Sequence, residues 1–280
     1  MHPYTPGWLL PKLIELDQTY QNRYDPWKHT LTTGTLLPIR PIHFLSPGDR
    51  EFEQTLRMIK RCLDCVDPYA HVGRTLTYVV EWMLFALGHP VQTEHPKSPF
   101  AGRNETTPNK LIKTLDLEQL IRFPADYWGH LLAIEKYGTE VNFYPTLPTV
   151  ARTMATTAIS ATQASGKMGP YQGYDPCLGT GRLALELSNY CHSLLGWERM
   201  ELLIKTAVLN FVLYAPTFAY PIPALGGDVV RGNSLDRTGS SVVRSNLEYF
   251  TTAQPLPSPS LTQTTPYAPT HATPQQLSLF

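Results

Sequence analysis

The sequence predicts an α/β fold in which a mainly helical first half precedes a parallel sheet with helices between its strands. Apolar residues recur at helical spacing over the first ~140 residues. From Val141 onward, short apolar runs alternate with helical segments, which is typical of parallel strands joined by crossover helices. Residues 251–280 contain no Asp, Glu, Lys or Arg and little that could be buried, so we expect a disordered C-terminal tail.

The first half, residues 1–138, is expected to be a mainly α-helical domain. Proline-rich breaks at 38–47 and 90–108 separate its helical segments. The expected helices are Trp8–Tyr20, Gly48–Val66, Thr75–Leu87, Lys110–Arg122 and Asp126–Tyr137. Acidic residues at the start of the second helix suit a helix N-terminus, and we interpret them as architecture and not as a site.

The second half, residues 139–237, is expected to be an α/β domain. A helix over Thr146–Ala161 precedes its first strand. The order that follows is strand Tyr171–Asp175, glycine turn, helix Arg182–Cys191, strand Ser193–Trp197, helix Met200–Tyr214 and strand Asp228–Gly232. Residues 238–275 are expected to be a disordered linker rich in Pro, Thr and Ser.

The composition limits the classes of partner and compartment. Lys plus Arg and Asp plus Glu both count 23, so the net charge gives no general attraction to phosphate, and any DNA contact must come from local basic clusters or from a partner. The four cysteines are too few for a disulfide framework, which favours a reducing cytoplasm. We recognise no signal peptide and no apolar run long enough to span a bilayer, and therefore expect a cytoplasmic protein with no membrane partner.

A glycine turn is the strongest local signal of a binding site. Gly179 and Gly181 lie between an expected strand and an expected helix, where residues without Cβ atoms let the backbone approach a ligand closely. The next strand is followed by Glu198, about twenty residues after the turn, where a carboxylate can accept hydrogen bonds from ribose hydroxyls. A glycine turn by itself can also serve only to turn the chain.

Four stretches resemble motifs of the gamma-type adenine-N6 DNA methyltransferases, which include the modification subunits of type I restriction systems. Residues Asp175–Gly181 read Asp-Pro-Cys-Leu-Gly-Thr-Gly and match the family's first motif, Asp-Pro-x-x-Gly-Thr-Gly. Asn142–Val150, which contains Tyr144, resembles the family's tyrosine-containing motif, although the usual order is Tyr-Thr-Pro. Asp126–Glu135 is similar to the helical segment before that motif, and Arg231–Leu235 to the motif that meets the cofactor's adenine.

The resemblance implies a truncated Rossmann-like methyltransferase domain that binds S-adenosylmethionine. The implied cofactor-binding residues are Tyr144, Asp175, Pro176, Gly179, Thr180, Gly181, Glu198 and Asn233. In the family these positions hold the methionine and sugar around the glycine turn, the ribose at the acidic residue after the second strand, here Glu198, and the adenine at Asn233. The sequence thus predicts a cofactor pocket at this turn.

The motif that would carry out methyl transfer is missing. Transfer to an exocyclic amine needs an acceptor that aligns the amine and an aromatic side chain on which the extruded base stacks. The family supplies these as Asn-Pro-Pro-Phe or Asp-Pro-Pro-Tyr, and no such motif follows Leu235. We therefore expect a protein that is not catalytic alone. One alternative is an active adenine methyltransferase subunit completed by a partner chain.

The remaining strands of the family's sheet are missing from the sequence too, which would leave an open sheet edge. Such an edge needs cover, and we expect it from the helical first half, from the Thr30–Leu45 segment or from another subunit.

The C-terminal peptide resembles the pentapeptide by which client proteins bind the bacterial DNA polymerase sliding clamp. Its residues are Gln276, Leu277, Ser278, Leu279 and Phe280. Its amide suits a small polar pocket, and its apolar side chains suit a hydrophobic groove. The resemblance implies the sliding clamp as a partner and double-stranded DNA as a second partner reached through it. It also leaves open an alternative function for the chain, that of a non-enzymatic clamp-binding adaptor or inhibitor. The simpler interpretation is that an unstructured tail ends in these residues.

Three other groups of residues have simpler interpretations. The pair Cys62 and Cys65 lacks a second pair at ligand spacing, so buried structural thiols are favoured over a metal site. Two groups of basic residues are interpreted by default as solvated helix faces, and the second of them is the preferred candidate for DNA contact. They are Arg57, Lys60 and Arg61, and then Lys97, Arg103, Lys110 and Lys113.

Overall fold

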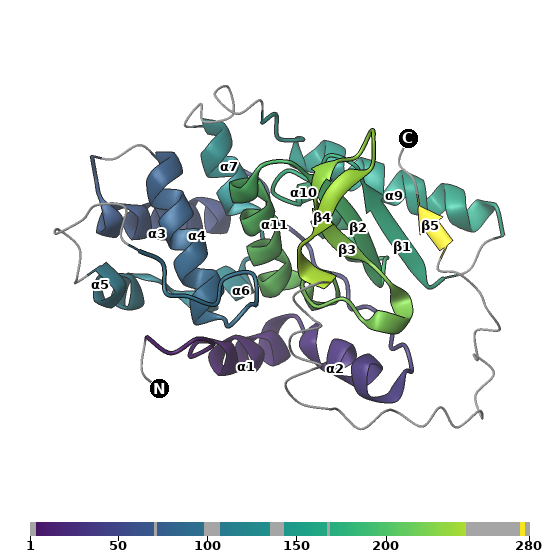
Figure 1. Cartoon of the computed structure of the whole chain (residues 1–280), viewed down its shortest axis with the longest axis horizontal. Coiled ribbons are helices and arrows are strands. Elements are labelled where there is room, and N and C mark those ends of the chain that lie inside the picture. The colour runs from purple at the N-terminus through teal and green to yellow at the C-terminus, as the bar shows by residue number, and fades with distance from the viewer. Residues whose placement is uncertain are drawn as a thin grey trace.

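A five-stranded, mostly parallel sheet organises the second half of the chain, in the order β4-β3-β2-β1-β5 (Figure 1). Strands β1, β2, β3 and β5 are parallel to one another, and β4 is antiparallel to β3. Their bounds are β1 Tyr171–Asp175, β2 Ser193–Glu198, β3 Asp228–Asn233, β4 Thr238–Ser241 and β5 Gln275–Leu277. The structure is a computed structural model, and it describes residues 4–69, 72–97, 107–134, 143–166, 169–244 and 275–277.

The three central strands lie in the order 3-2-1 and are joined by helices α10 and α11. This is the order of one half of a doubly wound, nucleotide-binding sheet. In register, Asp175 at the end of β1 faces Gly196, and Glu198 at the end of β2 faces Arg231. The predicted α/β fold with a Rossmann-like strand arrangement is confirmed, and the carboxyl ends of its strands form one edge.

Figure 1 shows α3 to α6 at one end of the molecule, the sheet at the other, and α11 between them. The helices are α1 Leu10–Tyr20, α2 Tyr24–Thr33, α3 Arg50–Val66, α4 Val72–Ala86, α5 Thr107–Thr114, α6 Leu117–Arg122, α7 Tyr127–Ile134, α9 Pro148–Ala164, α10 Arg182–Leu187, α11 Glu201–Tyr214 and α12 Pro216–Ala219, with a 3-10 turn, η1, at Pro223–Leu225. Within the described ranges, no helix combines the length and the apolar character that crossing a bilayer requires.

Helix α11 joins the helical half to the sheet. Every residue from Leu202 to Tyr214 except Lys205 is buried, as expected for a helix that is apolar all round. It contacts α4 on one side and β2 and β3 on the other. One hydrophobic core therefore extends from Leu9 to Val243, and both expected domains contribute to it. The expected boundary at residue 138 falls outside the described residues.

Several expected elements differ from the observed ones for local reasons. Helix α2 was not predicted, because apart from Pro26 in its first turn and a left-handed Gly34 after its end it has little periodic signal. The single helix expected over Lys110–Arg122 is two helices, because the Asp116 side chain accepts a 2.9 Å hydrogen bond from Gln119 N and starts α6. The disordered linker was expected to begin at residue 238, but residues 238–241 form β4 against β3. The expectation of disorder up to residue 280 is also wrong at Gln275–Leu277, which form β5 beside β1.

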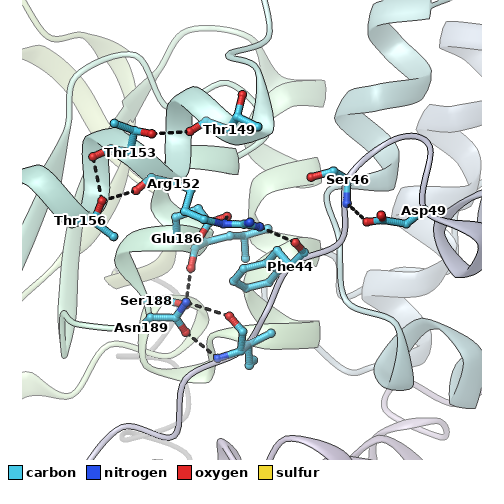
Figure 2. Close-up of polar contacts among 12 residues, drawn as sticks. Phe44, Ser46, Asp49, Thr149, Arg152, Thr153, Thr156, Glu186, Ser188 and Asn189 are labelled. Carbon is cyan, nitrogen blue, oxygen red and sulfur yellow. Dashed lines mark hydrogen bonds and ion pairs between the residues drawn. The ribbon is translucent and has the colours of Figure 1, made fainter.

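The segment after α2 crosses α10 and is held there by two polar side chains (Figure 2). Asn189 accepts a 2.8 Å hydrogen bond from Ile42 N and donates a 2.9 Å bond to Ile42 O. Arg152 Nη2 donates to Phe44 O at 2.7 Å and its Nε lies 3.3 Å from Glu186 Oε1. The 30–45 segment, one of the expected covers for an open strand edge, is not paired with a strand in the described sheet. Beside β1 that place is taken by β5, where Gln276 is in register with Gln172.

Candidate functional site

The turn after β1 needs glycine at two positions. Gly179 has φ 55° and Gly181 has φ 82°, both in the left-handed region that residues with a Cβ disfavour. A Cβ at Gly179 would lie 3.0 Å from Cε2 of Phe143, and one at Gly181 would lie 2.9 Å from Cε1 of Phe211. Both the backbone conformation and the close packing therefore exclude larger residues from this turn.

Glu198 closes the turn from the end of β2. Its Oε2 accepts a 3.0 Å hydrogen bond from Gly179 N. Its Oε1 accepts hydrogen bonds from Arg199 N at 2.6 Å and from Met200 N at 3.0 Å. The structure thus brings together the glycine turn and the carboxylate that the sequence analysis paired, and both lie at the carboxyl edge of the sheet.

Asp175 ends β1 and is buried, with 4% of its surface exposed. The pKa of Asp175 is raised to about 6, mainly by burial. The 3.1 Å hydrogen bond from Cys177 N lowers this pKa, and the negative charge of Glu198 raises it further. A nearby cation would favour the charged form of such a carboxylate. The end of β1 is therefore suited to a ligand that carries positive charge.

A cavity of about 120 Å³ opens beside Asp175 and the glycine turn. It is lined by Phe143, Tyr144, Pro145, Thr146, Met154, Asp175, Cys177, Leu178, Gly179, Thr180, Arg182 and Leu183. Tyr144 is 78% exposed at this cavity, and the thiol of Cys177 is free and exposed. Burial and the nearby charges of Asp175 and Glu198 raise the pKa of Cys177. The cavity combines an apolar wall with one buried carboxylate.

A second, open cavity of about 530 Å³ lies at the ends of β2 and β3. Arg199, Arg231, Asn233 and residues of β4 line it. Asn233 is committed to the hairpin between β3 and β4, because its amide donates to Asp236 Oδ2 at 2.9 Å and its oxygen accepts from Leu235 N at 3.2 Å. Glu198 is hydrogen-bonded to one lining residue of each cavity, to Gly179 N of the first and to Arg199 N of the second.

A buried carboxylate, Asp126, ties the glycine turn to the helical half. Its Oδ2 accepts hydrogen bonds from Thr180 Oγ1 at 2.7 Å and Arg182 Nε at 3.1 Å. Its Oδ1 accepts from Gly129 N at 2.9 Å and Asn210 Nδ2 at 3.0 Å. Each oxygen of this buried carboxylate thus accepts two hydrogen bonds, so the carboxylate itself is fully paired. It fixes the position of the turn relative to α7 and α11.

Arg182 extends this network to the segment before α9. While its Nε donates to Asp126, its Nη1 donates a 2.6 Å hydrogen bond to Thr146 O. Thr146 and the neighbouring Tyr144 line the first cavity. Arg182 therefore holds one wall of the cavity against the glycine turn.

No protein-family model matches the sequence, and a search of curated proteins gives no match. Among solved structures, the fold is similar to a Listeria monocytogenes protein described as a class I S-adenosylmethionine-dependent methyltransferase. The identity is 11% and the TM-score is 0.39 over 67% of this chain and 55% of that one. The chain thus spans about half the length of the structure that it matches.

The remaining predicted site residues lie in different surroundings. Pro176 is in the turn after β1 but does not line the cavity, and Gly181 faces Phe211 of α11. Thr180 lines the cavity, although its hydroxyl is engaged by Asp126.

The C-terminal peptide is described only in part. The backbone of Gln276 and Leu277 belongs to β5, and the predicted residues Ser278, Leu279 and Phe280 lie outside the described residues.

Sequence reasoning missed the network around Asp126. Asp126 is separated from Thr180 and Asn210 by 54 and 84 residues. Two features of the sequence could have indicated this network. Asp126 begins the segment Asp126–Glu135 that resembles a family motif, and Arg182 directly follows the glycine turn.

Proposed function

We propose that the chain binds S-adenosylmethionine at the carboxyl edge of its sheet and is a DNA-associated, methyltransferase-like protein that is not catalytic alone. The observation that supports this most directly is the pair of carboxylates, Asp175 and Glu198, on neighbouring parallel strands beside Gly179. S-adenosylmethionine carries positive charge at its methionine end and two hydroxyls on its ribose. One carboxylate suits the first of these groups and the other suits the second.

The two cavities support an extended ligand. Ligand pockets usually measure about 300–1,000 Å³, and the first cavity, at about 120 Å³, is smaller. We place the methionine end there, beside Asp175 and Tyr144, and the nucleoside toward the cavity of Arg199 and Asn233. The hairpin uses one amide hydrogen and one lone pair of the Asn233 side chain, which leaves one of each for an adenine contact.

The proposal excludes independent methyl transfer because the acceptor motif is missing. The sequence contains neither Asn-Pro-Pro nor Asp-Pro-Pro. After β3 the chain turns directly into antiparallel β4, where a hairpin replaces a further crossover. Transfer of labelled methyl groups to DNA by the purified chain would overturn this part. Transfer only with a co-purifying chain that carries the motif would support the split-enzyme alternative.

Calorimetric titration tests cofactor binding. Wild type is expected to bind S-adenosylmethionine, and Asp175→Ala is expected to bind it at least about tenfold more weakly, because about 1.4 kcal/mol corresponds to a tenfold change. Asp228→Ala is the matched control, since Asp228 begins β3 at the opposite end of the sheet. Equal affinities for all three proteins would refute the site.

Cys177 provides an independent measurement. Its thiol is exposed in the first cavity, whereas Cys62 and Cys191 are buried. In a Cys65→Ser background, S-adenosylmethionine is expected to slow alkylation of Cys177 at alkaline pH. Alkylation at the same rate with saturating cofactor would show that the ligand, if bound, lies elsewhere.

For the C-terminal peptide, we propose that Gln276–Phe280 docks the chain on the sliding clamp, with the clamp bringing it to double-stranded DNA. Deleting Leu279 and Phe280 is expected to abolish clamp binding and to leave the unfolding temperature unchanged. Unchanged clamp affinity would remove this part of the proposal. Clamp binding by a chain that fails to bind S-adenosylmethionine would instead support the adaptor or inhibitor alternative.

A further inference from the structure

A groove between α3 and α5 brings together two basic groups that are far apart in the sequence. Arg61 on α3 and Lys110 and Lys113 on α5 line a groove of about 510 Å³. The two helices meet beside it, where Cys65 Sγ lies 3.4 Å from Thr114 Oγ1. These three cations are exposed to solvent.

The stripe of positive charge continues along α3. Arg57, Lys60 and Arg61 are exposed and are spaced three and four residues apart, which places them on one face of the helix. Asp64 is the single carboxylate among the residues that line the groove. The groove therefore carries a local excess of positive charge in a chain whose formal net charge is zero.

The cations of the groove differ from other cations of the chain in their pairing. Arg152, Arg182, Lys205 and Arg231 each lie within 3.3 Å of a carboxylate oxygen. In the described part of the chain, Arg61, Lys110 and Lys113 form no such ion pair. Their charge is therefore available to an external anion.

The lining of the groove also restricts the class of partner. It consists of Arg61, Asp64, Cys65, Lys110, Lys113 and Thr114, with no aliphatic or aromatic side chain. Protein interfaces normally bury an apolar centre, whereas contacts to phosphodiesters come from Arg, Lys and hydroxyl side chains. We propose that the groove between α3 and α5 binds the phosphate backbone of double-stranded DNA.

The inference rests on the proposed function, because that function is the reason for choosing DNA as the polyanion. It adds a direct contact between this chain and DNA that does not depend on the sliding clamp. The groove lies at the end of the molecule away from β1 and α9 (Figure 1). A contact to the phosphate backbone of DNA gives affinity without sequence preference. The groove is thus a local basic surface on a chain whose formal net charge is zero.

Binding of the full chain to a duplex of about 30 base pairs and arbitrary sequence tests the inference, at several salt concentrations. Lys110→Glu/Lys113→Glu is expected to weaken binding about tenfold or more and to make the plot of log affinity against log salt shallower by about two, because each lost phosphate contact removes about 0.9 from the slope. The control, Lys28→Glu/Arg40→Glu, makes the same change of charge at exposed positions on α2 and just after it. It is expected to bind like wild type.

Three outcomes would overturn the inference that the groove binds DNA. They are no binding of the duplex by wild type, equal affinities of the two double variants for the duplex, or a loss of affinity that is confined to RNA of the same length. If charge reversal unfolds the protein, Lys110→Gln/Lys113→Gln gives the same comparison without added repulsion. S-adenosylmethionine is titrated into the same variants, and its affinity is expected to stay unchanged. A wild-type protein that binds the duplex but does not bind S-adenosylmethionine would refute the proposed function and would still support DNA binding in the groove.

Discussion

The backbone N–H of Gly179 donates a 3.0 Å hydrogen bond to Oε2 of Glu198, so the carboxylate after β2 holds the turn after β1. The other oxygen of Glu198 holds the backbone that leads into α11. One side chain thus sets the shape of the sheet edge between two parallel strands. A ligand at this edge meets a preformed arrangement and not a mobile one.

Replacing Glu198 with Gln is expected to weaken S-adenosylmethionine binding about tenfold and to lower the free energy of unfolding by about 1–2 kcal/mol, because one oxygen acceptor and the negative charge are lost. Calorimetry and urea unfolding measure the two effects. Glu201→Gln is the control, since Glu201 is 55% exposed and pairs with Lys205 and Arg231. A Glu198→Gln protein that binds the cofactor like this control would contradict the assignment of the ribose to Glu198.

The charge on Asp175 is expected to reduce stability at neutral pH. Its pKa of about 6 in the folded state exceeds the ordinary value of 3.8, so the folded state binds more protons than the unfolded state between these values. The stabilisation that this provides is complete below pH 3.8 and is lost as the pH rises through 6. Asp175→Asn should therefore raise the free energy of unfolding at pH 8 by about 3 kcal/mol. Denaturant unfolding at pH 8 and at about pH 3 measures the difference, which should disappear at the lower pH because Asp175 is then protonated in both states.

The same property predicts how binding depends on pH. Because protonation removes the negative charge of Asp175, wild type should lose affinity for S-adenosylmethionine as the pH falls through about 6. The Asn variant should show weak affinity with little dependence on pH. A wild-type affinity that is constant from pH 5 to pH 8 would argue against contact between Asp175 and the cationic end of the ligand.

His89 is expected to make the protein sensitive to acid. It is buried, its Nε2 lies 3.1 Å from Ala219 O, and its Nδ1 accepts a 3.2 Å hydrogen bond from Val91 N. Burial lowers the pKa of His89 to about 4. Because the unfolded state takes up a proton below pH 6.5 and the folded state does not, stability should fall by about 3 kcal/mol as the pH drops from 6.5 to 4. His89→Gln should flatten this part of the stability curve, whereas His43→Gln, at an exposed position, should not.

Removing the carboxylate of Asp126 is expected to be among the most destabilising single changes. Asp126→Ala leaves four donors without their acceptor and the half-buried Arg182 without its ion pair, which should cost about 3–5 kcal/mol. Asp116→Ala removes only a helix cap and should cost about 1 kcal/mol. Thermal unfolding compares the two variants. Similar losses in both would show that the Asp126 network contributes little.

Much of the sheet could be predicted from the sequence. Strand β1 has the predicted bounds, and β2 and β3 each extend one residue further. The apolar pairs in β2 and β3 and the turn residues around all three strands leave a clear local signal. Because these strands are parallel and consecutive, their carboxyl ends had to meet. The juxtaposition of Asp175, Gly179 and Glu198 follows from order along the chain alone.

The remainder depends on contacts that leave no periodic pattern. Strand β4 has the sequence Thr-Gly-Ser-Ser, with no apolar residue to mark it, and it forms because β3 offers an edge. The network of Asp126 joins residues of α10 and α11 that are distant in sequence. Helix α2 was missed because its apolar residues show little helical periodicity. Such elements are stabilised by tertiary packing more than by local propensity.

Strand β5 has a thermodynamic consequence for any partner of the C-terminal peptide. The backbone of Gln275–Leu277 is paired with β1. The N–H and C=O groups on that edge of β5 cannot form hydrogen bonds with β1 and with a receptor at the same time. A receptor that takes Gln276 and Leu277 must first draw them out of the sheet, so it sees only the fraction of chains in which that segment is released. An isolated synthetic peptide would therefore bind more tightly than the intact protein, and the ratio of the two dissociation constants would report how firmly the sheet retains its last strand.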